Sequence, residues 1–196
     1  MNSRELKRAK RRIRQEVRAD RDALEASERE RASVSIAERV LALPEVEDAT
    51  AVMAFWSFGS EVGTAPLIAG LHARGVRVAL PRIVDGDLVP VTYVPGDPVT
   101  TTAFGACEPS AGRTLDPAAI DVVVTPGVAF DLSGRRVGYG GGFYDRFFGR
   151  TDPGAVRVGI GFESQVVVGD LPGGHFDLGL DILVTQARVV RFGRRG

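Results

Sequence analysis

The stretch Asp131-Leu-Ser-Gly-Arg-Arg-Val-Gly-Tyr-Gly-Gly-Gly-Phe-Tyr-Asp145 carries the clearest signal in this sequence. It follows an apolar, mostly β-branched run over 121–125, which is typical of a strand buried on both faces. A helix is expected to begin near Gly142 and to reach Phe148. Four glycines within 138–142 permit positive φ angles and let a ligand approach the backbone closely. Strand, glycine loop and helix in this order predict a phosphate site in an α/β fold.

The residue types around this loop favour phosphate chemistry. Successive backbone N–H groups can converge on an anion, and the start of the next helix adds partial positive charge. Arg135 and Arg136 can donate charge-assisted hydrogen bonds, and Asp145 is a hard oxygen ligand suited to magnesium. The alternative is a tight turn in which glycines only relieve crowding. The segment is neither a Walker A loop nor a G-x-G-x-x-G dinucleotide motif.

The rest of the chain predicts helices first and then alternating strands and helices. Apolar residues at helical spacing predict a first helix up to about Leu24, and the box Ser27-Glu-Arg-Glu30 predicts that a second helix starts there. That helix should run toward Leu43 and end at Pro44. We expect strands over 51–56, 76–80, 88–94, 121–125, 156–162, 182–185 and 188–192, helices over 64–74 and 142–148, and a loop over 100–116. This order argues for an α/β sandwich with a largely parallel sheet.

Composition excludes several classes of protein. The 196 residues carry 25 basic and 25 acidic side chains, so there is no overall bias toward nucleic acid or membrane. One cysteine, Cys107, excludes an internal disulfide, and with only two histidines it excludes a cysteine/histidine zinc site. No apolar run is long enough to span a bilayer or to form a secretory signal. We therefore expect a cytoplasmic protein with no membrane, nucleic-acid or obligate protein partner.

Several ordered motifs resemble the 5-formyltetrahydrofolate cyclo-ligase (methenyltetrahydrofolate synthetase) family. The run 138–146, preceded by Thr-Pro-Gly-Val-Ala-Phe-Asp at 125–131, is similar to the family signature. Segments 10–14 with 18–24, 58–64, 104–109 and 180–185 are similar to further blocks in the same order. The resemblance implies a Rossmann-like three-layer sandwich. It further implies a single domain over 1–196, with N-terminal helices in 1–43 packed on an α/β core in 50–196.

The resemblance also implies an activity. ATP would phosphorylate the formyl oxygen of 5-formyltetrahydrofolate in a magnesium-dependent reaction. The neighbouring nitrogen would then close the ring to 5,10-methenyltetrahydrofolate, with release of ADP and phosphate. Such an enzyme mainly positions two ligands and neutralises charge on the transferring phosphoryl group.

The roles implied for individual residues fall into three groups. Lys10, Arg14 and Arg136 would be catalytic and would bind ATP together with Gly138, Tyr139, Gly140, Gly141, Gly142, Phe143 and Tyr144. Trp56, Glu61 and Phe143 would bind the folate, and Asp145 with Asp181 would hold magnesium. Without the resemblance, Trp56 reads as core, Glu61 as a capping or solvated carboxylate and Asp181 as a turn residue.

The basic N-terminal segment leaves three interpretations open. Seven basic residues and one acid lie between Arg4 and Arg14. They could form a solvated helix face, contact nucleic acid or, as the family implies, grip ATP through Lys10 and Arg14, which are four residues apart and share a face.

The chain departs from the family at three places. Phe143 stands where tyrosine is common, and Gly63 where an acid is common. The stretch Pro172-Gly-Gly-His-Phe-Asp177 lacks the usual glutamate and displaces the histidine, so His175 receives no role. Alternatives to the cyclo-ligase are a non-catalytic nucleotide or folate binder, a nucleic-acid-binding protein and a different small-molecule kinase.

Overall fold

The protein is an α/β structure built on one mixed, mostly parallel sheet. The computed structural model describes residues 2–102, 105–174 and 177–193. The sheet has the order β11-β10-β9-β6-β1-β2-β3, in which only the two edge strands, β11 and β3, run antiparallel to their neighbours. Its strands are β1 (Ala51–Met53), β2 (Arg77–Val84), β3 (Asp87–Thr92), β6 (Val122–Thr125), β9 (Val156–Ile160), β10 (Ile182–Val184) and β11 (Val189–Arg191). The predicted α/β sheet is therefore confirmed.

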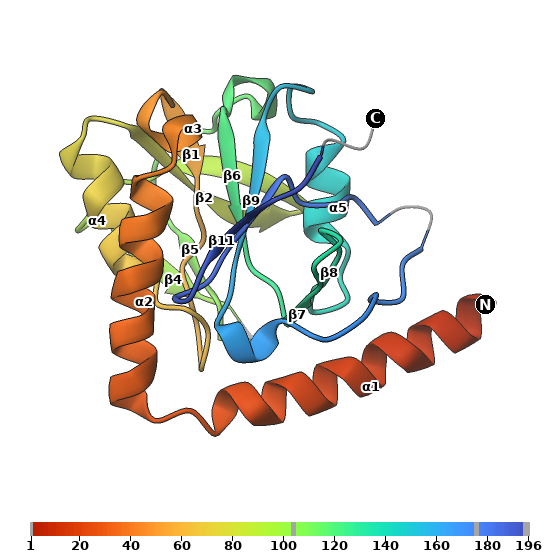
Figure 1. Ribbon diagram of the computed structural model, residues 1–196. Coiled ribbons are helices and arrows are strands. Elements are labelled where there is room, and N and C mark those ends of the chain that lie inside the picture. Colours follow the sequence, from red (N-terminus) through yellow and green to blue (C-terminus); the bar gives the residue numbers. More distant parts are fainter. Residues whose placement is uncertain (1, 103–104, 175–176, 194–196) are drawn as a thin grey trace.

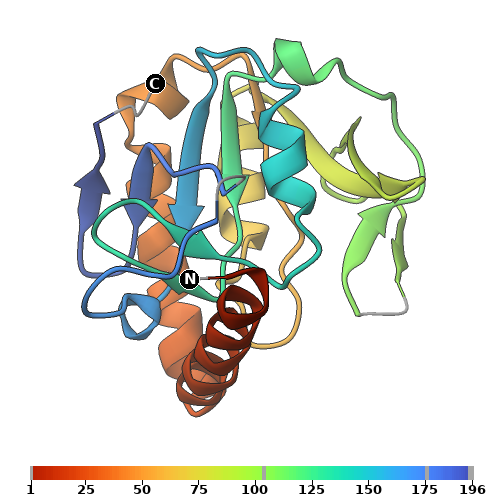
Figure 2. The same ribbon diagram turned by 90° about the vertical axis from the view of Figure 1, so that its right-hand side faces the viewer.

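Helices cover both faces of this sheet, so the molecule has three layers (Figures 1 and 2). The helices α2 and α4 lie on one face, and α5 lies on the other. The helices are α1 (Ser3–Asp22), α2 (Ala26–Leu41), α3 (Pro44–Glu47), α4 (Ala65–Ala73) and α5 (Phe143–Phe148), with 3-10 turns η1 (Pro117–Ala119) and η2 (Glu163–Gln165).

The core divides along the alternation of side chains in the strands. Val52 and Val122 point to the face covered by α2 and α4, where they join the larger cluster of buried residues. Their neighbours Met53 and Val123 point the other way and pack with Phe147 of α5. Residues that alternate in a strand face opposite sides of the sheet, and every one of these side chains is almost fully buried. Each such burial contributes about 1.5–3 kcal/mol to folding.

The long helix α1 belongs to neither helical layer. It crosses the edge of the sheet where the central parallel strands end (Figure 1). Val17 and, less deeply, Ile13 pack against Val128 and Val137, which lie beside the glycine loop. The remaining faces of α1 carry charge, which explains why the sequence shows a strongly amphipathic segment there. No helix in the described part of the chain is long and apolar enough to cross a membrane.

Some element boundaries differ from the sequence predictions. The helix α2 begins at Ala26 with Glu25 as its N-cap, so the predicted capping box at Ser27 is wrong. Leu24 packs on the core directly after α1, which leaves only a short connection before α2 starts. That helix ends at Leu41, and Pro44 opens the short α3 at a position where its missing N–H is harmless. The first strand ends at Met53, so Trp56 lies beyond it.

Two short hairpins were not predicted. The segment expected to be a loop contains β4 (Val99–Thr101) paired with β5 (Cys107–Pro109). A second pair, β7 (Ala129–Phe130) and β8 (Arg136–Val137), precedes the glycine loop. Its turn is organised by the buried Asp131 carboxylate, which accepts hydrogen bonds from the N–H groups of Ser133, Arg135 and Leu171 at 2.8–2.9 Å. This hairpin fixes where the loop begins.

Candidate active site

The glycine loop runs from Gly138 to Gly142 between β8 and α5, and its glycines are required by geometry. Gly140 and Gly142 have φ angles of 109° and 65°, which side chains other than glycine rarely adopt. A Cβ on Gly141 would lie 2.5 Å from the Phe143 ring, and one on Gly138 would lie 2.9 Å from the Arg136 guanidinium. The loop therefore follows a path that brings bare backbone against functional side chains.

A cavity of about 440 Å³ lies between this loop and α1. We call it the charged cavity because cations and carboxylates surround it. It is lined by Ser3, Leu6, Lys7, Lys10 and Arg14 of α1, by Pro126, Arg136, Asp145 and Asp177, and by residues 138–144. The structure thus brings together every residue that the sequence assigned to ATP.

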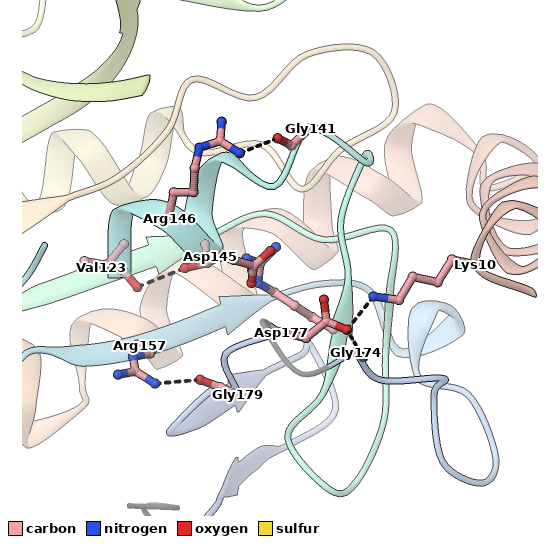
Figure 3. Close-up of polar contacts among 11 residues, drawn as sticks. Lys10, Val123, Gly141, Asp145, Arg146, Arg157, Gly174, Asp177 and Gly179 are labelled. Atoms are coloured by element: carbon pink, nitrogen blue, oxygen red, sulfur yellow. Dashed lines mark hydrogen bonds and ion pairs between the residues drawn. The ribbon is translucent and has the colours of Figure 1, made fainter. Parts of the chain in front are cut away.

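Two cationic side chains of α1 contact the opposite wall of the charged cavity. Arg14 donates from Nε to the carbonyl oxygen of Gly138 over 2.7 Å. Lys10 forms an ion pair with Asp177, which also accepts the N–H of Gly174 at 2.6 Å (Figure 3). The Lys10 side chain is only 15% exposed, so its ammonium points into the cavity rather than into bulk solvent. The predicted shared face of Lys10 and Arg14 is therefore the inner face of α1.

Arg136 and Asp145 form an ion pair that lines the charged cavity. Arg136 donates from Nη2 to Asp145 over 3.1 Å, and its side chain is 5% exposed. Its guanidinium also lies 5.5 Å from the ring centres of Tyr144 and Phe148, within the range of cation–π attraction. Burial lowers the pKa of Arg136, and Asp145 opposes that shift. The pair offers phosphate a fixed cation whose position is set by packing.

A second cavity, of about 540 Å³, lies on the other side of the loop. We call it the aromatic cavity. It is lined by the aromatic residues Phe55, Trp56, Phe58, Tyr139, Phe143 and Tyr144, by Pro81, Ile83, Leu88, Thr102, Ala106, Pro126 and Gly141, and by Arg18, Glu61, Cys107 and Glu108. The predicted folate residues Trp56, Glu61 and Phe143 therefore lie in one cavity, which can stack and enclose a planar ring system.

Glu61 is the buried carboxylate of the aromatic cavity and is 8% exposed. One of its oxygens accepts the N–H of Phe58 at 3.0 Å, and the other accepts the hydroxyl of Tyr139. Burial raises the pKa of Glu61, while these hydrogen bonds and the nearby Arg21 and Arg18 oppose the rise. Glu61 is thus positioned by the protein, unlike a solvated surface carboxylate.

The two cavities meet at a common wall. Pro126, Tyr139, Gly141, Phe143 and Tyr144 line both of them. A phosphorylated ligand in the charged cavity and a ring compound in the aromatic cavity would therefore approach each other across the glycine loop. This adjacency is what transfer of a group between two bound molecules requires.

Two acidic residues depart from the sequence prediction. Asp181, the predicted partner of Asp145, lines neither cavity, and its carboxylate accepts the N–H of Arg157 at 2.8 Å. Asp177 lines the charged cavity and was not predicted to be functional. The available signal was its place at the end of the 172–177 stretch, where the family pattern also ends in an aspartate. His175 lies outside the described residues.

The mostly parallel sheet, with a charged cavity and an aromatic cavity that meet on one glycine loop, is typical of an α/β enzyme that brings two ligands together. The chain belongs to the 5-formyltetrahydrofolate cyclo-ligase family, whose model matches residues 6–186. Its activity as a cyclo-ligase in folate one-carbon metabolism, with ATP as co-substrate, follows from this membership.

Individual relatives agree with the family assignment. The chain is 35% identical over 179 residues to the 5-formyltetrahydrofolate cyclo-ligase of Haemophilus influenzae, covering 88% of this chain and 95% of that one. It is 34% identical over 183 residues to the enzyme of the same name from Escherichia coli, covering 88% and 98%. The solved structure of Aquifex aeolicus 5,10-methenyltetrahydrofolate synthetase matches 95% of each chain with a TM-score of 0.81 and 31% identity.

Proposed function

We propose that the charged cavity binds the triphosphate of ATP and that the aromatic cavity binds the pterin of 5-formyltetrahydrofolate. The observation that carries this assignment is the common wall, at which two cavities of opposite chemical character meet on one glycine loop. Cations converge on one side of it, and rings with a buried carboxylate lie on the other. The γ-phosphoryl group would then face the formyl oxygen across Gly141 and Phe143.

The reaction proceeds in two steps. The formyl oxygen attacks the γ-phosphorus of ATP, the bond to the β-phosphate oxygen breaks, and ADP leaves. The adjacent amine nitrogen then attacks the formyl carbon, the carbon–oxygen bond breaks, and inorganic phosphate carries away the former formyl oxygen. The attacking nitrogen loses its proton, and the product is 5,10-methenyltetrahydrofolate. Phosphorylation converts a poor leaving group into a good one. The attacking amine is weakly basic, so it gives up its proton readily after attack and needs no strong general base.

The chain's own residues neutralise charge during the phosphoryl transfer. Lys10 and Arg14 of α1 line the charged cavity, and Arg136 of β8 lines it as well. Lys10 pairs with Asp177 and Arg14 with a backbone carbonyl, so contacts within the protein hold both cations in position. Preorganised cations avoid the reorganisation that water would need, which is where much of the rate enhancement of such reactions arises.

Glu61 orients the folate ring. Its carboxylate lies at the buried part of the aromatic cavity, where it can accept hydrogen bonds from pterin N–H groups. Trp56 and Phe143 provide flat apolar surface against the ring.

The residues of the charged cavity fit a magnesium ion bound together with ATP. Magnesium commonly takes one or two carboxylates and completes its shell with phosphate oxygens and water. Asp145 and Asp177 line this cavity, and we assign to Asp177 the role predicted for Asp181. The described residues contain no group of three or more histidine, cysteine, aspartate or glutamate side chains that could hold a metal ion. When bound, it would offset phosphate charge.

The test is ultraviolet absorbance of the purified protein with 5-formyltetrahydrofolate, magnesium and ATP, which follows growth of the methenyl chromophore. Growth that requires ATP and scales with protein supports the proposal. ADP formation with a phosphorylated product and no chromophore would point to a different kinase, and binding without ADP formation to a non-catalytic binder. A cytoplasmic location and the absence of an obligate protein partner stay predictions from the sequence.

A further inference from the structure

A hydrogen-bonded chain links α1 to the aromatic cavity through a loop residue. Arg21 donates from Nη1 to the hydroxyl oxygen of Tyr139 over 3.2 Å and from Nε to Ser60 over 3.0 Å. Tyr139 in turn donates its hydroxyl to Glu61. Arg21 is 3% exposed although it lies on a highly charged helix. Three segments that are distant in sequence therefore converge on one carboxylate.

The direction of each hydrogen bond in this chain is fixed. A guanidinium can only donate, so the Tyr139 oxygen accepts from Arg21 and its own proton must point at Glu61. A hydrogen bond donated to a charged acceptor contributes more than a neutral one. The sequence placed Tyr139 with ATP, but its hydroxyl is committed to the carboxylate of the aromatic cavity.

The chain offsets the cost of burying Glu61. The groups that face this carboxylate are Arg18 and Arg21 from α1, Tyr139 from the glycine loop, the N–H of Phe58 from its own turn, and the phenol of Tyr144 from α5. Burial raises the pKa of Glu61, and the bond from Tyr139 is the largest influence that lowers it again. Without the Tyr139 hydroxyl, the protonated form of Glu61 would become more stable relative to the carboxylate.

We propose that Tyr139 and Arg21 are positioning residues for the folate substrate, which act by holding the Glu61 carboxylate in the orientation that receives the pterin. This inference rests on the assignment of the folate to the aromatic cavity. Tyr139 lines both cavities, and its hydroxyl donates to Glu61, a residue of the aromatic cavity.

The affinity for folate should depend on pH through Glu61. Glu61 accepts charge-assisted hydrogen bonds on both oxygens only as a carboxylate, so folate binding is strongest above the pKa of Glu61 and weakens as the pH falls through it. Loss of the Tyr139 hydroxyl removes an influence that lowers this pKa. The pH at which binding weakens should therefore move upward in a variant that lacks this hydroxyl.

The chain has one tryptophan, Trp56, and it lines the aromatic cavity, so its fluorescence reports folate occupancy. The test titrates 5-formyltetrahydrofolate in the absence of ATP into wild type, Tyr139→Phe and Tyr93→Phe. In Tyr139→Phe the phenylalanine keeps the ring of Tyr139, whose centre lies 5.6 Å from that of the Phe58 ring. Tyr93 lines neither cavity and is the matched control for loss of a tyrosine hydroxyl.

Tyr139→Phe should raise the folate Kd at least about 5-fold and shift its acid limb to higher pH, whereas Tyr93→Phe should change the Kd less than 2-fold. The KM for ATP should change less than about 2-fold in both variants. Arg21→Met should weaken folate binding in the same direction. A wild-type folate Kd in Tyr139→Phe, or an effect confined to ATP, overturns the inference.

A double-mutant cycle tests whether Tyr139 acts through Glu61. Adding Tyr139→Phe to Glu61→Gln should change the Kd far less than adding it to wild type, because the carboxylate is already gone. Additive effects would overturn the proposed route. Turnover of the wild type is the separate arm: no ATP-dependent chromophore there refutes the proposed function, whereas an active wild type with an unaffected Tyr139→Phe refutes only this inference.

Discussion

Removal of the Asp145 carboxylate should weaken both the fold and the reaction. Asp145 is the ion-pair partner of Arg136, whose side chain is 5% exposed, while that of Asp145 is 25% exposed. Deleting one partner leaves a buried charge without compensation, which costs about 3–5 kcal/mol when the pair is fully buried. The partial exposure of Asp145 reduces this to about 2–4 kcal/mol. For a chain of this size, Asp145→Ala should lower Tm by roughly 5–15 °C.

The exposed pair of Arg146 with Asp87 supplies a matched control. Its ion pair spans 3.3 Å, close to the 3.1 Å of the buried pair, but its side chains are 50% and 54% exposed. Exposed pairs contribute about 0–1 kcal/mol, so Asp87→Ala should move Tm by no more than about 4 °C. The assay is thermal unfolding of both variants without ligands. Equal losses of Tm would refute the argument from burial.

The same variant bears on the metal assignment. At a temperature where Asp145→Ala is folded, its magnesium-dependent turnover should fall at least about 10-fold, equivalent to about 1.4 kcal/mol of barrier. Wild-type turnover across a magnesium titration would remove Asp145 from the metal site.

Three further predictions follow from the cavity walls. Lys10→Ala should raise the KM for ATP at least about 5-fold and leave the KM for folate unchanged. Steady-state kinetics measure both constants, and an unchanged KM for ATP would show that Lys10 does not bind ATP. Tyr144→Phe removes a buried hydroxyl with no hydrogen-bond partner among the described residues, so ligand-free Tm should not fall; a clear decrease would contradict this. Gly140→Ala strains a φ of 109° and should lower kcat/KM at least about 10-fold, and wild-type kinetics would show that the loop tolerates a side chain.

The sequence predicted the layers of the fold because long periodic segments carry the signal. The β-branched run at β6 and the amphipathic repeat of α1 identify their elements without tertiary information. The hairpins β4–β5 and β7–β8 were missed because strands of two or three residues are too short to show a period. The first hairpin lies against the sheet through contacts of β5 with β2, and the second is held by the Asp131 turn; only the folded chain supplies these contacts.

The candidate site was predictable to the extent that its residues lie in motifs. Lys10, Arg14 and Arg136 all line the charged cavity. The helical spacing predicted that Lys10 and Arg14 share a face, whereas the ATP role of these two residues came from the family resemblance. Asp177 was missed because its partner Lys10 is 167 residues away, and because the stretch that it ends departs from the family pattern, which obscured the one local signal. Arg21 was missed for a different reason: an arginine on a highly charged helix reads as surface until the fold shows it buried.

The common wall explains why the loop is rich in glycine at Gly141 as well as at the positions with unusual φ angles. Gly141 lines both cavities, and a Cβ there would lie 2.5 Å from the Phe143 ring, which also lines both. A side chain at this point would force that ring to move and, in the proposed arrangement, would widen the gap across which the phosphoryl group would pass. Because transfer depends on close approach of the two reactants, even a methyl group at Gly141 should act on the rate more than on the affinity for either ligand.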